Sequence, residues 1–495
     1  MLTTGPGRLV EDGIGLHRVE DGTSLHRVED GTGLRRTMLR LATAGSVDDG
    51  KSTLVGRLLF DTDSVLTDTL EHVEEVSRRK GLDRADLALL TDGLRAEREQ
   101  GITIDVAYRY FHTPARKFIL ADCPGHVQYT RNTVTGSSTA DVIVLLVDAR
   151  KGVVEQTRRH LAVAALLRVP HVVLVVNKID LVDFSEDVFT RIATDFAVLA
   201  RSLGVGDSHC IPVSATEGDN VVTRSPRTPW YEGPTVLGYL ETVDDTPLAV
   251  GADLRFPVQH VIRPQGAVLA PWAASAPPVD ADYRGYAGKI ESGRVRVGDE
   301  IIVLPRGSHA TVVAVDTPDG PLDVAVAGQS VTLRLDTDID VSRGDILAGA
   351  DAPPPPVREL SGTVCWLAER TLSAGARVLV QHGTALTKGV VRSVDGVLDL
   401  AFASGGTPNW QPATQLGLND IGRVRVALAS PLAVDSYREH RATGAFILVD
   451  EADGWTLGAG MAGSTAIHAG TGPAPTPPSS PPASTAPPRR TKEGH

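Results

Sequence analysis

Residues 45–52 read GSVDDGKS, a complete G-x-x-x-x-G-K-S pattern. Successive backbone N–H groups of such a loop converge on a phosphate, which requires a strand before the loop and a helix N-terminus after it. The flanking sequence meets both conditions. An apolar, strand-like run covers 38–44, and a helix-forming segment, KSTLVGRLLF, begins at Lys51. The pattern therefore predicts an α/β domain with a site for a nucleotide phosphate.

The residues of this loop are expected to contact the nucleotide in different ways. Gly45 and Gly50 allow the loop to turn its N–H groups onto the β-phosphate, and Lys51 would place its cation on the β and γ oxygens. The hydroxyl of Ser52 would bind Mg²⁺. The predicted contact set is Gly45, Ser46, Val47, Asp48, Asp49, Gly50, Lys51 and Ser52. The competing interpretation, a glycine-rich turn without a ligand, does not explain the strand and the helix on either side.

The segment NKID ends the apolar run HVVLVV, which is typical of a buried parallel strand. At the carboxyl edge of that strand, Asp180 could accept hydrogen bonds from N1–H and the 2-amino group of guanine, which adenine lacks. Asn177 would brace the neighbouring loops, and Lys178 would lie along the base. The residues expected around the base are Asn177, Lys178, Ile179 and Asp180, with Ser214 and Ala215 after the run HCIPV. The nucleotide is therefore predicted to be GTP.

Residues 122–126, DCPGH, follow the apolar run KFILA and are candidates for sensing the γ-phosphate. Asp122 would lie near Mg²⁺ through a water molecule, and the N–H of Gly125 would approach the γ-phosphate. His126 is the candidate for positioning the attacking water, with Lys51 as the second catalytic residue. A structural hydrogen-bonding role for this loop histidine remains the alternative. The expected contacts of the segment are Asp122, Cys123, Pro124, Gly125 and His126.

Thr103, in EREQGITID, is a further expected Mg²⁺ ligand. It would come from a loop that becomes ordered when the γ-phosphate is present. An ordinary strand threonine is the alternative interpretation. The predicted metal ligands are therefore Ser52, Thr103 and Asp122.

Apolar runs alternate with helical segments as far as residue 242. This alternation predicts a mostly parallel sheet with helices on both faces. The segments are, in order, VIVLLVDA, EQTRRHLAVAALL, HVVLVV and SEDVFTRIATDFAVLARSLG. Residues 106–111 and 117–121, separated by HTPAR, are expected to form its one antiparallel pair. We therefore expect a P-loop GTPase domain over 38–242.

After residue 247 the pattern changes to short alternating strands broken by Gly, Asp and Pro, such as RFPVQHVI, GDEIIVLP and SVTLRL. It predicts two closed β-barrels, over 248–352 and 357–464, joined by a stiff proline linker at 353–356. The Pro/Ser/Thr-rich tail, 465–495, is expected to be disordered.

Residues 9–35 hold three near-copies of a nine-residue unit, LVEDGIGLH, RVEDGTSLH and RVEDGTGLR. Their composition favours a disordered repeat extension over 1–37, with Met38 as a candidate initiator. A small interaction tail is the alternative interpretation.

Charge and cysteine content narrow the function classes. The chain has 495 residues, with 49 Lys and Arg against 61 Asp and Glu, and a formal net charge of −12. Proteins that bind tRNA or the ribosome more often show basic stretches, so no nucleic-acid partner is expected. The three cysteines lie far apart without metal-binding spacing, which suits a reducing compartment. No apolar run reaches membrane-spanning length and the start is unlike a signal peptide, so we expect a cytoplasmic protein without a membrane partner.

Together these motifs resemble the translation-factor class of GTPases, and within it the GTPase (large) subunit of heterodimeric sulfate adenylyltransferase. Elongation factor Tu and its relatives usually carry histidine where this chain has Ser46 and Asp49. The segments that resemble the sulfate-activation subunit are GSVDDGKST, 92–111, 128–132, 148–160 and 418–450. That family usually has Thr at the position of Cys123 and Glu at that of Val127, so the departures flank the segment that would sense hydrolysis.

The resemblance implies a subunit that binds GTP and Mg²⁺. It further implies that GTP hydrolysis is coupled to formation of adenosine 5′-phosphosulfate and pyrophosphate from ATP and sulfate, within sulfate assimilation and cysteine biosynthesis. The implied partner is a small subunit of the ATP-pyrophosphatase type, in a heterodimer or higher assembly, and it would hold ATP and sulfate. No second G-x-x-x-x-G-K-[ST] pattern occurs, so adenylylsulfate kinase activity is not expected. Two alternatives remain open: a translation GTPase like elongation factor Tu, and a regulatory GTPase that uses the nucleotide only as a switch.

Overall fold

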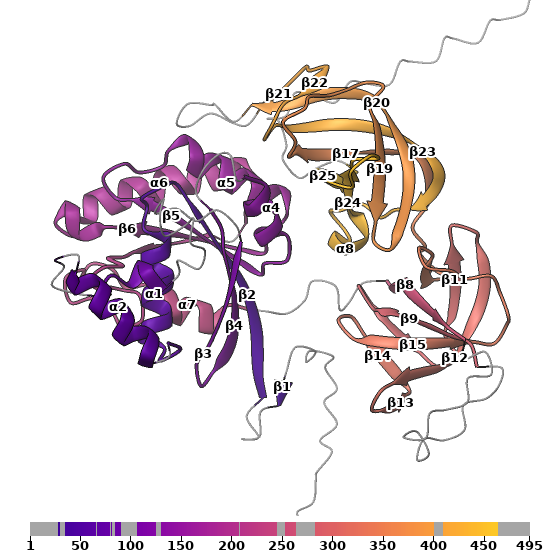
Figure 1. The fold of residues 1–495 in the computed structure, drawn as a ribbon, viewed down its shortest axis with the longest axis horizontal. Coiled ribbons are helices and arrows are strands. Elements are labelled where there is room, and N and C mark those ends of the chain that lie inside the picture. Colours follow the sequence, from indigo (N-terminus) through magenta and orange to yellow (C-terminus); the bar gives the residue numbers. More distant parts are fainter. Residues whose placement is uncertain are drawn as a thin grey trace, which may run out of the picture.

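A helix-covered sheet and two barrels of strands follow one another along the chain (Figure 1). The structure is a computed structural model that describes residues 28–29, 35–65, 67–79, 81, 85–90, 106–124, 130–206, 208–244, 253–263, 283–399 and 409–463. The predicted fold class is confirmed, because an α/β domain with a mostly parallel sheet precedes two β-barrels.

The sheet of the first domain has the strand order β3-β4-β2-β5-β6-β7. Its strands are β2 (Arg35–Gly45), β3 (Ala107–His112), β4 (Arg116–Asp122), β5 (Val142–Asp148), β6 (His171–Asn177) and β7 (Ser208–Pro212). Neighbouring strands of this series are parallel except for β3, which pairs with β4 in the antiparallel sense, as predicted. β5 is buried along its whole length, as expected for an apolar run in a sheet covered on both faces.

Helices pack on both faces of this sheet. Leu58 and Leu240 belong to the apolar cluster on one face, and Leu161 and Phe196 belong to the cluster on the other. The helices are α1 (Lys51–Asp61), α2 (Thr67–Arg79), α4 (Thr130–Ser138), α5 (Glu155–Leu166), α6 (Glu186–Ser202) and α7 (Val236–Thr242), with the 3₁₀ turns η1 (Leu87–Leu90) and η3 (Ile179–Val182). Among the helices of the described ranges, none is both long and apolar enough to cross a membrane.

The N-terminal boundary differs from the prediction. β2 begins at Arg35 rather than at Met38, and β1 (Val28–Glu29) pairs with its first two residues in the antiparallel sense. The expectation that 1–37 lacks structure is therefore wrong for these residues, and the sheet has a second antiparallel pair. β2 extends beyond its neighbour β4, and the backbone groups of its free end pair with the preceding chain. The remainder of the extension lies outside the described residues.

The first barrel is a closed ring of six strands in the order β11-β16-β8-β9-β15-β12, with β12 returning to β11. The ring strands are β8 (Arg255–Ile262), β9 (Gly285–Lys289), β11 (Glu300–Leu304), β12 (Ser308–Thr317), β15 (Ser330–Leu335) and β16 (Ile346–Gly349). β13 (Gly320–Leu322) extends the ring, and β10 (Arg294–Arg296) pairs with β14 (Val324–Val326) beside it. Inward-facing residues such as Phe256 and Val303 form its apolar core.

The second barrel is also a ring of six strands, in the order β19-β24-β25-β17-β23-β20, closed by β20 against β19. Its ring strands are β17 (Pro356–Trp366), β19 (Arg377–His382), β20 (Ala385–Asp399), β23 (Ile421–Ala433), β24 (Ala445–Val449) and β25 (Thr456–Ala462). β18 (Leu372–Ser373), β21 (Asn409–Gln411), β22 (Gln415–Leu416) and the short helix α8 (Arg441–Gly444) complete it. Pro356 already belongs to β17, so the predicted linker is one residue too long. The tail, 465–495, lies outside the described residues.

A buried ion pair joins the two barrels. The guanidinium of Arg255 in β8 donates to both carboxylate oxygens of Asp435, each at 2.9 Å, and the two residues are almost fully buried. Asp435 also accepts from the hydroxyl of Thr443 at 2.5 Å. The second barrel touches the first domain through Tyr437, whose hydroxyl donates to the carbonyl oxygen of Leu167 at 2.9 Å. The barrels are therefore tied to each other and to the end of α5.

His160 in α5 makes stability depend on pH. Its side chain is fully buried, one ring nitrogen lies 2.9 Å from Nε2 of Gln156, and burial lowers its pKa to about 3. An unfolded histidine titrates near pH 6.5. Below that pH the imidazole binds a proton in the unfolded chain but stays neutral in the folded chain. The contribution of His160 is therefore complete above pH 6.5 and is lost as the pH falls toward 3.

We expect the change from pH 7 to pH 5 to lower the free energy of unfolding by about 2 kcal/mol through His160 alone. Urea unfolding of the wild type and of His160→Gln at both pH values measures this difference. The variant should lose that part of the pH dependence, whereas His309→Gln, at an exposed site, should keep it. Equal pH dependence in the wild type and His160→Gln would contradict the assignment.

Candidate nucleotide site

The predicted phosphate-binding loop connects the end of β2 at Gly45 to the start of α1 at Lys51. Gly50 has a φ of 91°, and a Cβ at this residue would lie 2.2 Å from Nδ2 of Asn177. A Cβ at Gly45 would lie 2.8 Å from the carbonyl oxygen of Leu146. Both glycines are therefore required by close packing, in addition to the backbone freedom for which the pattern selects them.

The Lys51 ammonium lies inside this loop. Nζ donates to the carbonyl oxygens of Gly45 at 2.9 Å and Ser46 at 2.7 Å. Burial lowers the pKa of Lys51, and the nearby carboxylates of Asp122 and Asp49 act in the opposite direction. The cation is thus held within the loop that would surround a phosphate.

Asp49 braces the loop from within. Its Oδ2 accepts a hydrogen bond from the N–H of Ser46 at 2.7 Å, and burial raises its pKa. Asp49 is predicted from its place in the sequence motif to contact the nucleotide. The observed role of its side chain is to hold the loop conformation, and the neighbouring Asp48 is exposed with a φ of 65°.

Asp122 and Ser52 are the expected Mg²⁺ ligands within the described residues, and Ser52 is the second residue of α1. Asp122 ends β4, is almost fully buried, and accepts from the hydroxyl of Thr43 at 2.8 Å. Thr43 lies directly opposite Asp122 in the register of β2 and β4, a contact that no sequence motif signals. Hydroxyl and carboxylate oxygens are ligands that suit Mg²⁺, so the residues present fit this ion. Thr103 lies outside the described residues.

Asn177 links the phosphate-binding loop to the loop expected around the base. Its Nδ2 donates to the carbonyl oxygen of Asp49 at 2.7 Å, and its Oδ1 accepts from the N–H of Ala215 at 3.0 Å. Asn177 ends β6 and is 2% exposed, so both hydrogen bonds are sheltered from water. One side chain therefore sets the separation between the two halves of the site.

We expect Asn177→Ala to lower the free energy of unfolding by about 2–3 kcal/mol, because it leaves a buried carbonyl and a buried N–H without partners. Affinity for a guanine nucleotide should fall as well, since the two loops lose their common brace. Denaturant unfolding and fluorescence titration with a labelled GDP measure the two effects. The matched control, Asn409→Ala, removes an exposed asparagine of β21 and should change neither quantity. Unchanged stability of Asn177→Ala would contradict the bracing role.

Lys178 joins an ionic network beside the loop. Its Nζ lies 3.2 Å from Oδ2 of Asp148, and it also donates to the carbonyl oxygen of Asp48. Asp148 ends β5 and pairs with Arg150, which together with Lys178 holds the pKa of that carboxyl well below its usual range. Asp148 was not predicted from the sequence, because its contact with Lys178 depends on β5 and β6 being neighbours. The network fixes the lysine that is expected to lie along the base.

The remaining base-side residues come from two short segments. Asp180 lies in η3 directly after β6 and is partly exposed, which leaves its carboxylate accessible to a base. Ser214 is buried, and the N–H of Glu217 donates to its hydroxyl at 3.3 Å. Arg57 of α1 donates to the carbonyl oxygens of Ala215 at 3.2 Å and Thr216 at 2.6 Å. Helix α1 therefore supports both loops of the site: it begins at the phosphate-binding loop, and its Arg57 holds the base-side loop.

The segment after β4 is described only in part. Cys123 is fully buried, a Cβ at Gly136 of α4 would lie 2.4 Å from its Sγ, and burial raises the pKa of its thiol. The cysteine is therefore a packing residue beneath α4 rather than a reactive thiolate. Gly125 and His126 lie outside the described residues, so their predicted roles stay predictions.

Two family models match this chain. The elongation factor Tu GTP binding domain family matches residues 36–248, and the GTP-eEF1A C-terminal domain-like family matches residues 359–462. The bifunctional enzyme CysN/CysC of Mycobacterium tuberculosis is 48% identical over 426 residues, which cover 86% of this chain and 67% of that protein. Among solved structures, sup35 complexed with GMPPNP is 24% identical, with 86% of this chain and 94% of that chain covered and a TM-score of 0.38.

A second relative matches nearly its full length. Sulfate adenylyltransferase subunit 1 of Cellvibrio japonicus is 46% identical over 429 residues, which cover 86% of this chain and 87% of that protein. The first domain of the chain has the loop, the strand order and the family match of a GTP-binding domain. The chain therefore belongs to the sulfate adenylyltransferase subunit 1 family, and its first domain is a GTP-binding domain of the elongation factor Tu type.

Proposed function

We propose that this protein is the GTP-hydrolysing subunit of a sulfate adenylyltransferase. GTP hydrolysis would be coupled to the formation of adenosine 5′-phosphosulfate and pyrophosphate from ATP and sulfate. The observation that carries the proposal is the Asn177 bridge between the phosphate-binding loop and the base-side loop. It holds together the two halves of a GTP site in a chain whose relative is named sulfate adenylyltransferase subunit 1.

The residues of the site divide the chemistry of phosphoryl transfer. Lys51 would stabilise negative charge on the β and γ oxygens as water attacks in line with the leaving group. Ser52, Asp122 and Thr103 would hold Mg²⁺, which supplies further charge stabilisation when it is bound. His126 would position the attacking water. Asp180 would select guanine through the two donors on its edge.

The partner in this proposal is a small subunit of the ATP-pyrophosphatase type. The name of the relative, subunit 1, implies a second subunit. Sulfate oxygen would attack the α-phosphorus of ATP in that partner and release pyrophosphate. The present chain would contribute GTP hydrolysis and the surfaces that transmit it, inside the cytoplasm where ATP and GTP are available.

Adenosine 5′-phosphosulfate formation from ATP and sulfate tests the proposal directly. The chain is mixed with the small subunit from the same genome, and product is measured with and without GTP. We expect product that depends on GTP and is lost with Lys51→Ala, because that variant lacks the cation of the phosphate-binding loop. The control is Lys388→Ala, which removes an exposed lysine of β20 and should leave product formation intact.

Two other outcomes would redirect the assignment. GTP hydrolysis without any response of product to GTP would reject coupling and leave a regulatory GTPase. Binding of aminoacyl-tRNA by the GTP-loaded chain would favour a translation factor instead. His126→Ala separates turnover from switching, since it should reduce hydrolysis while GTP affinity survives.

A further inference from the structure

A large cavity lies where the three domains meet, and we call it the junction cavity. Its volume is about 1230 Å³, and its lining includes Asp141 and Arg168 of the first domain, Glu291 of the first barrel, and Arg438 and Arg441 of the second. Interfaces between domains are common places for small-molecule sites, and this volume exceeds that needed for a nucleotide-sized ligand.

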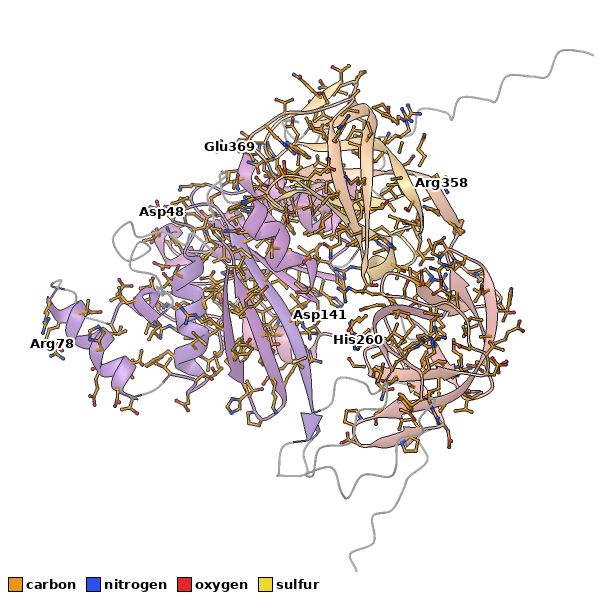
Figure 2. The ribbon with its side chains drawn as sticks, turned by 45° about the vertical axis from the view of Figure 1, so that its right-hand side comes forward. Asp48, Arg78, Asp141, His260, Arg358 and Glu369 are labelled. Atoms are coloured by element: carbon orange, nitrogen blue, oxygen red, sulfur yellow. The ribbon has the colours of Figure 1, made fainter. Side chains whose placement is uncertain are left out.

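The junction cavity is separate from the nucleotide site. Asp141 directly precedes β5, at the amino-terminal edge of the parallel sheet, whereas Asp48 lies in the loop at the carboxyl edge. Figure 2 shows these two residues on opposite sides of the first domain, with Asp141 on the side of the barrels. A ligand in the cavity would therefore not compete with a nucleotide for the same groups.

Three arginines gather at the part of this cavity bounded by α5 and the second barrel. Arg168 follows α5 with a φ of 50°, and Arg438 and Arg441 come from the segment between β23 and β24. Burial lowers the pKa of Arg168, and the charges of Arg441 and Arg438 act in the same direction. Within the described part of the chain, the guanidinium groups of Arg168 and Arg438 make no hydrogen bond and no ion pair.

Only one of the three arginines is explained by a favourable interaction with the C-terminal end of a helix. Arg441 donates to the carbonyl oxygen of Ser138 at 3.2 Å, which places a cation at the C-terminal end of α4. The corresponding carbonyl at the end of α5, that of Leu167, already accepts from the hydroxyl of Tyr437. Arg168 is therefore not needed to satisfy that carbonyl.

The lining also includes four carboxylates, Asp141, Asp244, Glu291 and Glu439, and among the described residues none of them forms an ion pair with the three arginines. Asp141 accepts from the N–H of Arg40 at 2.8 Å, and Glu291 pairs with Lys289 at 3.0 Å. Glu439 also lines the cavity but is exposed. The groups that shift the pKa of Arg168 include no carboxylate. Nδ1 of His440, beside Arg441, is buried without a hydrogen-bond partner in the described structure. The guanidinium groups of Arg168 and Arg438 are thus left without a partner among the described residues.

We propose that the junction cavity binds a small tetrahedral oxyanion, a sulfate or phosphate group, between Arg168 of the first domain and Arg438 and Arg441 of the second barrel. Guanidinium groups match such oxyanions because each presents parallel N–H donors to two oxygens. An anion held there would tie the end of α5 to the segment that also contacts the end of α4. The site would thus reinforce docking of the barrel on the first domain, and this inference does not depend on the proposed function.

Equilibrium binding of inorganic sulfate to the GDP-loaded full chain tests this site, because GDP occupies the phosphate-binding loop. We expect saturable binding of one sulfate, weakened about tenfold by Arg168→Asn and by Arg438→Gln, since each removes a charge-assisted hydrogen bond. Asparagine suits the positive φ at residue 168, and Arg438 is exposed, so both variants should fold. Arg392→Gln, at an exposed arginine on β20, is the matched control and should bind sulfate as the wild type does.

Parallel titrations with inorganic phosphate and with adenosine 5′-monophosphate separate the sources of the oxyanion. Tighter binding of the monophosphate, sensitive to the same two variants, would identify a nucleotide-borne group. Comparable binding of the free ions would identify sulfate or phosphate itself. Absence of saturable binding for all three probes at low ionic strength would overturn the proposal, as would equal affinities in the wild type, Arg168→Asn and Arg438→Gln.

Discussion

Replacement of Asp180 by asparagine should reduce GTP affinity by at least about a hundredfold, because one of the two acceptor oxygens is replaced by an NH2 group that faces the 2-amino donor of guanine. The same substitution should allow binding of xanthosine triphosphate, in which a carbonyl oxygen replaces the 2-amino group and can accept from the new amide. Asp180 lies in η3, which follows β6, and is partly exposed, so the change should leave the fold intact. Competition binding with both nucleotides measures the exchange of specificity.

A neighbouring carboxylate provides the control for this variant. Asp183→Asn alters an exposed aspartate three residues away, whose φ of 54° asparagine tolerates. It should bind GTP as tightly as the wild type and gain no affinity for xanthosine triphosphate. If Asp180→Asn behaved in the same way, the base would have to be read by a different residue.

The second large effect is expected between the barrels. Arg255→Met should lower the free energy of unfolding by about 3–5 kcal/mol, because it leaves Asp435 as an uncompensated buried charge. Arg255 and Asp435 are 3% and 6% exposed in their side chains, and the hydrogen bond from Thr443 would remain on the carboxylate. Denaturant unfolding of the full chain, followed by tryptophan fluorescence, measures this loss.

A double substitution distinguishes the lost partner from lost packing. Arg255→Met combined with Asp435→Leu removes both charges and should recover much of the stability that the single variant loses. Lys388→Met, which breaks an exposed ion pair with Glu451, should cost no more than about 1 kcal/mol. A double variant as unstable as Arg255→Met would show that the barrels depend on the shape of the arginine and not on its charge.

The fold was predictable because each strand and helix has its own periodicity. The run VIVLLVD is apolar at every position before Asp148, which indicates a strand covered on both faces, and β5 is such a strand. The short alternating runs after residue 247 similarly indicated strands with one buried face, and the two rings confirm that class. The pairing of Val28–Glu29 with β2 was missed, because a two-residue strand in a charged repeat has no periodicity to detect.

The site was predictable only where a motif defines it. The phosphate-binding loop and NKID are contiguous patterns, so their residues could be named directly from the sequence. Thr43 was missed because it acts through Asp122, its register partner on the next strand, and register is a property of the folded sheet. Asp148 was missed because its contact with Lys178 depends on β5 and β6 being neighbours. The Arg255–Asp435 pair spans 180 positions between two separately folded barrels, and no local pattern announces it.

The closed rings of the two barrels limit how another molecule can recognise them. Each of the six strands in a ring has a hydrogen-bonded neighbour on both sides, so among the described residues the ring strands themselves present no edge to which an extended peptide could add as a further strand. A binding protein or synthetic inhibitor aimed at these barrels must therefore be selected for surface shape and side-chain complementarity, and libraries of strand-mimicking peptides are the wrong starting point.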